Sequence, residues 1–405
     1  MFLLHGAFPS LDYDELTIFC LLATVIPLWL YDFIFARVYN RPSTNLSAQR
    51  SKPDRRRVVI KLIGLYATFA LILFCYYLIP MYRAPFYKPY FYLIGTLLFI
   101  AIPVGAIYFW EMDGRLKNPY DEYWRLGCFL TGRFKEAKPS ILAEHARAWF
   151  IKAFFSPIMF AVLVEYVQFL STFQWKNISF LDTFNYLLTF TYTLDVLYAT
   201  LGFVLTLRIF DTHIRSTDTT ILGWIVCLAC YYPFNNWFGI GLFNYEDNVS
   251  WIGWLGQYPF FYYACGSLII LLNLVYGLAS VALGYRWSNL AYRGIITSGP
   301  YRFSKHPAYI TKMAYWWLIS LPFLSMEGPL IAFQHTLALI AISLIYYLRA
   351  KTEENHLSNY PEYVQYANWM NEHGIFSFVG KIFPALRYSE EKAKCWGSAV
   401  WWKKV

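Results

Sequence analysis

The sequence predicts an all-α integral membrane protein with about nine transmembrane helices, and three features of its composition support this class. Of its 405 residues, 58% are hydrophobic and only 15% are charged. Soluble globular domains have about 45–50% apolar and about 25% charged residues. Aromatic residues make up 21% of the chain and suit repeated crossings of the membrane–water interface. These numbers exclude a disordered protein, a coiled coil and a conventional soluble enzyme.

The apolar runs of the chain predict where it crosses the membrane. A spanning helix needs about 17–25 mostly apolar residues. Nine runs approach or reach this length: 16–35, 58–80, 90–110, 149–170, 186–207, 219–237, 258–283, 310–324 and 329–348. The eighth run is short and meets Pro322 near its end, so with the ninth it predicts a tight helical hairpin.

The basic residues predict the orientation of these spans. With the N-terminus outside, 29 Lys and Arg fall in the segments 36–57, 111–148, 208–218, 285–312 and 349–405, and 3 fall in the outer segments. Because positive residues favour cytoplasmic loops, we expect the C-terminus in the cytosol. The net charge of +9 is then a topology signal and predicts no nucleic-acid partner.

Two further features of the chain argue against a leader peptide and a metal site. Asp12, Asp14 and Glu15 precede the first apolar run, where a cleavable signal peptide would have basic residues. Cys227 and Cys230 form a CxxC pair, but it lies inside an apolar stretch and two further ligands at suitable spacing are missing from the sequence. We therefore predict no metal.

Polar residues concentrate in the loop before the predicted hairpin, 294–309, which reads GIITSGPYRFSKHPAY. Gly299 permits a tight turn, and Pro307 suits the first turn of the following helix because its missing N–H would be unpaired there anyway. The free N–H groups of that turn can hold a carboxylate or a phosphate. The alternative reading is a juxtamembrane anchor of basic and aromatic residues.

Two adjacent acidic residues, Glu353 and Glu354, follow the ninth span near the basic cytosolic face. Neighbouring side chains on a helix point about 100° apart, so one carboxylate can face inward while the other supports it. An inward carboxylate would suit a cationic group or a ribose diol. Alternatively, Glu353 pairs with Arg349 at i,i+4 on a solvated helix.

Together these residues resemble the isoprenylcysteine carboxyl methyltransferase family, over about residues 280–385. The resemblance rests on YRWSNL at 285–290, RGIITSGPYR at 293–302, KHPAY at 305–309 and the Glu353–Glu354 pair. Related phosphatidylethanolamine N-methyltransferases share the short Gly turn and the paired Glu. Residues 207–234 also look like longer bacterial members, so we expect a multi-pass protein of a bacterial inner membrane.

The sequence departs from the family pattern at three places. Lys305 stands where the family usually has Arg, and Lys lacks the planar fork that recognises a carboxylate bidentately. Thr311 replaces a common Gly, and the spacing from Leu357 to Tyr363 is slightly short. These departures affect the expected substrate more than the expected cofactor.

The resemblance implies a methyltransferase that uses S-adenosyl-L-methionine at the cytosolic membrane face. It implies cofactor-binding roles for Ser298, Gly299, Pro300, Tyr301, His306, Pro307, Tyr309, Glu353 and Glu354. Arg349, or else Arg302, would orient an acidic acceptor, whereas an amine acceptor would need His306 or Glu354 as a base. The acceptor would be a lipid or lipid-modified molecule from the bilayer, with a carboxylate favoured. The sequence leaves its identity, its acceptor atom and the oligomeric state open.

Residues 1–257 are then expected to form an N-terminal multi-span region of about six helices, and residues 258–405 a methyltransferase-like membrane domain with a cytosolic tail. A sterol-type C=C reductase that uses NADPH is an alternative, disfavoured by His306-Pro307 and the Glu pair. A non-catalytic scaffold or transport subunit is another. In that case the first six spans would bind a partner or lipid, and the C-terminal part would be vestigial.

Overall fold

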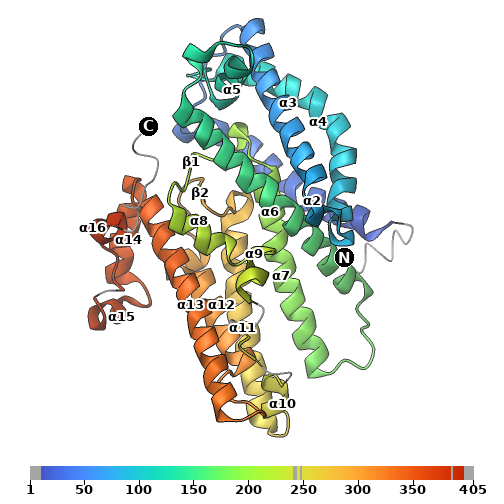
Figure 1. Ribbon diagram of the computed structural model, residues 1–405, viewed down its shortest axis with the longest axis vertical. Coiled ribbons are helices and arrows are strands. Elements are labelled where there is room, and N and C mark those ends of the chain that lie inside the picture. The colour runs from blue at the N-terminus through green and yellow to red at the C-terminus, as the bar shows by residue number, and fades with distance from the viewer. Residues whose placement is uncertain (1–10, 240–243, 247–248, 385, 396–405) are drawn as a thin grey trace. The chain divides into compact units, whose positions relative to one another are not determined.

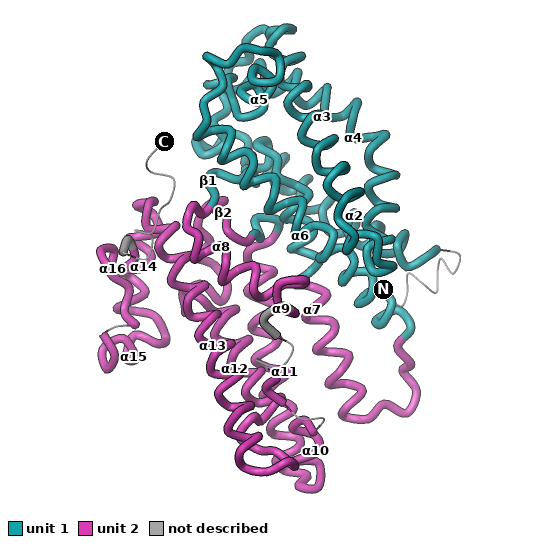
Figure 2. The backbone as a smooth tube through the Cα atoms, in the orientation of Figure 1, with its two compact units in different colours: residues 1–172, 196–217, 285–288 teal, residues 173–195, 218–284, 289–405 magenta. Residues whose placement is uncertain are grey.

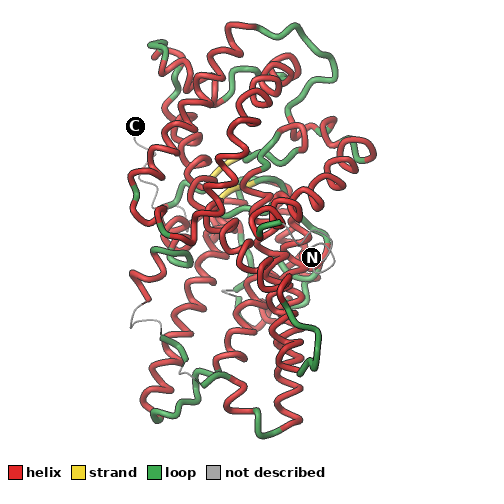
Figure 3. Tube along the Cα trace, turned by 90° about the vertical axis from the view of Figure 1, so that its right-hand side faces the viewer, coloured by secondary structure: helices red, strands yellow, loops and turns green. Residues whose placement is uncertain are grey.

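The computed structural model describes residues 11–239, 244–246, 249–384 and 386–395, and these residues are mostly helical (Figure 1). Figure 3 shows the helices, the loops that join them and the short strands. The helices are α2 (Tyr13–Leu30), α3 (Arg55–Leu78), α4 (Lys88–Arg115), α5 (Glu122–Leu130), α6 (Pro139–Thr172), α7 (Phe180–Val204), α8 (Ile221–Leu228), α9 (Phe234–Gly239), α10 (Trp251–Leu255), α11 (Pro259–Leu283), α12 (Pro307–Ser320), α13 (Pro329–Leu357), α14 (Pro361–His373), α15 (Ser377–Ile382) and α16 (Glu390–Cys395). The strands are β1 (Ser216–Thr217) and β2 (Ala291–Tyr292).

Among the described residues, seven helices are long and apolar enough to cross a membrane. They are Tyr13–Phe35, Arg55–Leu78, Pro85–Arg115, Pro139–Thr172, Phe180–Val204, Pro259–Arg286 and Pro329–Leu357. The chain is therefore a multi-pass integral membrane protein of the all-α class, as predicted.

The predicted count of nine spans is not confirmed, because the sixth and eighth apolar runs form shorter helices. The sixth run is divided between α8, with 8 residues, and α9, with 6 residues. Pro233 lies between them and cannot donate a backbone hydrogen bond to continue a helix. The eighth run is α12, whose 14 residues extend about 21 Å at about 1.5 Å per residue, less than a hydrocarbon core of about 30 Å.

The chain divides into two compact units (Figure 2). Unit 1 comprises residues 1–172, 196–217 and 285–288, and unit 2 comprises residues 173–195, 218–284 and 289–405. The boundary expected between residues 257 and 258 falls inside unit 2, just before α11, and the two functional regions proposed from the sequence stay a prediction.

In unit 1, two glycines allow α3 and α5 to approach closely. A Cβ atom on Gly64 would lie 2.3 Å from the carbonyl oxygen of Tyr123, and one on Gly127 would lie 1.9 Å from that of Ile60. Each distance is shorter than van der Waals contact, so a side chain at either position would separate the helices. Ile60, Trp124 and Cys128 form a small core beside this crossing.

In unit 2, α12 packs between α11 and α13. The indole nitrogen of Trp317 on α12 donates a hydrogen bond to the hydroxyl of Ser343 on α13, at 3.1 Å. Trp251 on α10, Ile269 on α11 and Tyr315 on α12 belong to one buried hydrophobic core, which packs these three helices together. Because α12 leads away from His306 and α13 returns to Glu354, the two segments that flank the hairpin meet at its polar end.

Candidate active site

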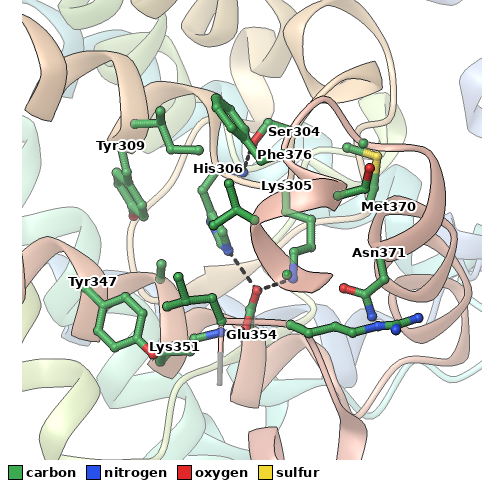
Figure 4. Close-up of a pocket in the computed structure, with 18 of the residues that line it drawn as sticks. Ser304, Lys305, His306, Tyr309, Tyr347, Lys351, Glu354, Met370, Asn371 and Phe376 are labelled. Carbon is green, nitrogen blue, oxygen red and sulfur yellow. Dashed lines mark hydrogen bonds and ion pairs between the residues drawn. The ribbon is translucent and has the colours of Figure 1, made fainter. Parts of the chain in front are cut away.

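Unit 2 contains a cavity of about 480 Å³ at this polar end (Figure 4). Its walls come from the loop before α12, from α12 and α13, and from α14, α15 and the segment after them. The polar residues of the lining include Ser304, Lys305, His306, Lys351, Glu354, Asn371 and Arg387, and the larger apolar or aromatic ones include Tyr309, Met313, Tyr346, Tyr347, Met370 and Phe376.

Glu354 is the centre of the polar lining, and its carboxylate is buried at 3% side-chain exposure. The ammonium of Lys305 lies 2.7 Å from Oε1, and that of Lys351 lies 2.8 Å from Oε2. The Nε2 atom of His306 lies 3.3 Å from Oε1 (Figure 4). A buried carboxylate is tolerable only when charges or donors of this kind compensate it.

Local sequence explains why these groups converge. Pro307 is the first residue of α12, so His306 stands at the N-terminal end of that helix. Lys351 precedes Glu354 by three residues on α13 and therefore lies on the same helix face. Because the loop ends at the start of α12 and Glu354 lies near the end of α13, the loop residues Lys305 and His306 lie beside the carboxylate.

The loop before α12 is fixed by α14 and the segment after it. The hydroxyl of Tyr366 donates to the carbonyl oxygens of Tyr301 and Ser304, at 2.7 and 3.3 Å. The backbone N–H of Ile375 donates to the carbonyl of Phe303 at 2.9 Å. Gly299 opens this loop with φ +59°, a conformation that a residue with a Cβ adopts only with strain.

The charged lining of the cavity is predominantly basic. Lys305, Lys351 and Arg387 line it together with one carboxylate, that of Glu354, which pairs with the two lysines, whereas Arg387 pairs with Glu372 outside the lining. The pKa of Lys305 is lowered because burial disfavours its charged form, although the negative charge of Glu354 opposes this shift. Burial likewise raises the pKa of the nearby Tyr301, and the charge of Glu353 adds to that effect. A basic and aromatic cavity of this kind can accept an anionic group beside an apolar one.

Arg349 is buried behind the cavity wall. Its guanidinium donates to the side-chain oxygen of Asn289 at 3.1 Å and lies 5.2 and 5.4 Å from the ring centroids of Tyr309 and Tyr346. The ring centroid of Tyr231 lies 5.8 Å from the same guanidinium. The alternative in which Arg349 pairs with Glu353 on a solvated helix is therefore wrong. Glu353 is exposed, and its carboxylate lies 3.8 Å from Nδ1 of His306.

The structure brings some of the predicted site residues to the cavity and leaves others outside its lining. His306, Tyr309 and Glu354 line it. The residues outside the lining are Ser298, Gly299, Pro300, Tyr301, Arg302, Pro307, Arg349 and Glu353. Ser298, Gly299 and Arg302 are exposed on the loop, whereas Pro307 and Arg349 are buried.

Sequence reasoning missed several lining residues. Lys305 entered only as a departure from a family pattern, and Lys351 was not singled out, although its position three residues before Glu354 could have indicated it. Met370, Asn371, Phe376 and Arg387 lie in or after α14, where the sequence predicted only a cytosolic tail. Within the part of the chain that the structure describes, no group of three or more His, Cys, Asp or Glu side chains is arranged to hold a metal ion.

Comparison with known proteins identifies one family. Residues 264–359 match the model of the isoprenylcysteine carboxyl methyltransferase (ICMT) family, which confirms the resemblance predicted from the sequence. The match covers just under a quarter of the chain and includes the loop before α12, the hairpin and both Glu residues. No curated protein and no solved structure matches the chain. The matched segment implies a membrane methyltransferase.

Proposed function

We propose that the protein is a methyltransferase that binds S-adenosyl-L-methionine in the unit 2 cavity and methylates a lipidic or lipid-modified acceptor. The observation that carries the proposal is the buried Glu354 carboxylate, held in a cavity by His306 and two lysines, all of which belong to the segment that matches the family. The proposed active face is cytosolic, with the N-terminus outside and the membrane a bacterial inner membrane. The basic segments of the sequence support this orientation.

The donor set of the cavity fits this cofactor, which carries a carboxylate, an ammonium, a sulfonium and a ribose diol. Lys305 would hold the carboxylate, together with Arg387 in exchange for its present partner Glu372, and the ring faces of Tyr309 and Tyr347 would lie against the cation. Glu354 keeps acceptor capacity for the diol or the ammonium, because a carboxylate offers about four lone-pair sites and its cationic partners leave some free. When bound, the cofactor supplies an electrophilic methyl group.

The work of the protein in this reaction would be alignment and exclusion of water. Holding two reactants in line can contribute up to about 7–11 kcal/mol of the barrier. An acceptor that is already a carboxylate needs no base, and the buried positive charge of Arg349 behind Tyr309 and Tyr346 would favour it. Arg302 is exposed outside the lining and is the weaker candidate for that role. For an amine acceptor, His306 would be a better base than Glu354, whose two oxygens already face lysines.

One observation favours a second candidate, an NADPH-dependent C=C reductase. The three basic side chains of the lining, Lys305, Lys351 and Arg387, would also suit the phosphates of a nicotinamide dinucleotide. Binding of the two cofactors separates these functions. The methyltransferase predicts that purified protein binds S-adenosylmethionine and that excess NADPH does not displace it, whereas displacement by NADPH would support the reductase.

A matched pair of variants tests the role of the cavity. Glu354→Gln removes the buried carboxylate, and Glu353→Gln removes its exposed neighbour on the same helix turn. We expect titration with labelled S-adenosylmethionine to show at least a tenfold loss of affinity for the first variant and less than a threefold loss for the second. Equal affinities for the wild type and both variants would contradict the cofactor assignment. Lipid analysis of cells fed a deuterated methyl donor, with and without the gene, would identify the acceptor.

A further inference from the structure

Unit 1 contains a second cavity, of about 780 Å³, whose lining is partly apolar and partly charged. Leu65 on α3 and Val104 on α4 belong to its apolar part. Glu144, His145 and Lys152 on α6 belong to its charged part. A cavity with one apolar and one charged region suits an amphiphile, whose chain and head group have the same division. None of these residues belongs to the proposed methyltransferase cavity.

The hydrogen bonds of His145 define what its ring offers to a ligand. Its side chain is buried, with the residue 6% exposed, and Nε2 lies 3.0 Å from the hydroxyl of Thr68. That hydroxyl donates its single hydrogen to the carbonyl of Gly64, at 2.8 Å. Thr68 must therefore accept from His145, so Nε2 carries the proton and Nδ1 of the neutral ring is an acceptor. Nδ1 is buried and has no hydrogen-bond partner among the described residues.

Glu144 offers a second unused acceptor in the lining of the same cavity. Its Oε2 accepts from the guanidinium of Arg147 at 2.6 Å and from the hydroxyl of Thr217 at 3.0 Å. Its Oε1 is buried without a hydrogen-bond partner in the part of the chain that the structure describes. Buried acceptors normally have a donor, so a group that supplies two donor hydrogens would complete both residues.

The remaining polar lining narrows the class of ligand. The rings of Tyr108 and Tyr123 line the same cavity, and aromatic faces attract an ammonium group, whereas the ring of Trp149 already carries the ammonium of Lys152 at 3.4 Å. Lys152 and Arg208 line it as well and suit a phosphate. A head group with an ammonium and a phosphate would satisfy both sets of residues.

We propose that this cavity binds an aminophospholipid. The ammonium donates to Nδ1 of His145 and Oε1 of Glu144, the phosphate lies near Lys152 and Arg208, and an acyl chain follows Leu65 and its apolar neighbours. The site is independent of the methyltransferase proposed for unit 2. Its test therefore measures lipid binding and not methyl transfer.

The first experiment compares lipids on the delipidated full-length protein in detergent, with binding followed by native mass spectrometry. Phosphatidylethanolamine has N–H donors, whereas phosphatidylcholine has the same phosphate and no donor. We expect phosphatidylethanolamine to bind about three- to tenfold more tightly, the effect of roughly one hydrogen bond. Equal affinities would overturn the proposal, because water would then satisfy the acceptors. Phosphatidylglycerol, with hydroxyl donors, binding as tightly as phosphatidylethanolamine would overturn the assignment of an ammonium.

The second experiment locates the preference. Glu144→Gln removes one of the two proposed acceptors and should reduce the preference for phosphatidylethanolamine, and Glu165→Gln, an exposed residue on the same helix, should retain it in full. A preference that is the same in Glu144→Gln as in the wild type would arise elsewhere and would overturn the site. An unfolding temperature near that of the wild type shows that the variant folds. If it does not fold, a photoreactive phosphatidylethanolamine on the wild type should label peptides around Tyr123 or Trp149, and labelling confined to unit 2 would contradict the proposal.

Discussion

Asp113 in unit 1 and Glu354 in unit 2 are both buried carboxylates surrounded by cations, and they differ in what lies beside them. Arg57 contacts Asp113 through two nitrogens, each at 2.7 Å, and Lys61 approaches it at 3.2 Å. The side chains of Asp113 and Lys61 are both 0% exposed, and Asp113 lines neither of the two cavities described above. Glu354 has cationic partners of the same kind and lines a cavity.

The difference teaches that burial and charge pairing alone do not identify a functional carboxylate. Arg57 and Lys61 come from α3 and Asp113 from α4, so this network joins two membrane helices of unit 1. Lys305 and Lys351 line the unit 2 cavity beside Glu354, whereas Arg57 and Lys61 line neither cavity, so a ligand in the cavity can reach only the second group of cations. The first network should therefore matter most for stability and the second for ligand binding.

The largest expected effect is on stability, from Asp113→Asn. The substitution removes the two 2.7 Å contacts of Arg57 and leaves Lys61 with Asp121 alone, at 3.0 Å, and breaking a buried ion pair costs about 3–5 kcal/mol. Unfolding of the detergent-solubilised protein by denaturant measures the change. Glu111→Gln is the control, because it removes an exposed pair with Arg50 and should cost at most about 1 kcal/mol. Equal losses for the two variants would mean that the buried Asp113 contributes no more to stability than an exposed ion pair.

Glu354→Gln should affect stability less, by about 1–2 kcal/mol, because water in the cavity can solvate Lys305 and Lys351 once the carboxylate is neutral. The same unfolding experiment measures this change beside Asp113→Asn. A loss as large as that of Asp113→Asn would mean that Glu354 is mainly structural. The comparison between the two units would then fail.

The sequence predicted the convergence of this site but not its inner detail. The hairpin and the paired Glu could be predicted, because they are local patterns. Which Glu faces inward could not, since it depends on the rotation of α13 against the loop, and the structure buries Glu354 and exposes Glu353. The position of Asn371 depends on how α14 folds back, which involves contacts between segments far apart in sequence such as Tyr366 with Tyr301.

The count of spans and the position of Arg349 were missed for physical reasons as well. The run 219–237 is apolar enough for a span, but hydrophobicity does not show that the helix breaks near Pro233. One of the two alternatives drawn from the sequence paired Arg349 with Glu353 on a solvated helix. Arg349 is instead buried among three tyrosines, where cation–π contacts and the hydrogen bond to Asn289 replace water.

Substituting the two candidate arginines should sharpen the proposed choice of acceptor. Arg349→Lys keeps the charge but loses the planar group that stacks on the tyrosines, so we expect about a tenfold loss of kcat/KM for a carboxylate acceptor. The affinity for S-adenosylmethionine should stay unchanged. Arg302→Lys, at an exposed position, should change neither quantity by more than about twofold. A larger effect of Arg302→Lys than of Arg349→Lys would reverse the assignment.

The smallest expected effect is the pH dependence of stability that Lys305 contributes. Its pKa in the folded protein is lowered from 10.5, chiefly by burial. Between the lowered pKa of Lys305 in the folded protein and its ordinary value of 10.5 in the unfolded chain, the unfolded chain binds more protons than the folded one. Stability should therefore rise with pH in that window. Lys305→Arg should flatten this rise, because Arg keeps its proton throughout the range. The measurement is the unfolding temperature of both proteins as the pH approaches 10.5.

Glu354→Gln supplies the complementary case. Removing the negative charge that holds the pKa of Lys305 up should lower that pKa further, so the rise in stability should begin at a lower pH than in the wild type. If Glu354→Gln and wild type give the same profile, the carboxylate does not control the protonation of Lys305. The contact of 2.7 Å would then be a packing contact, and the basic lining would not depend on its single acidic member.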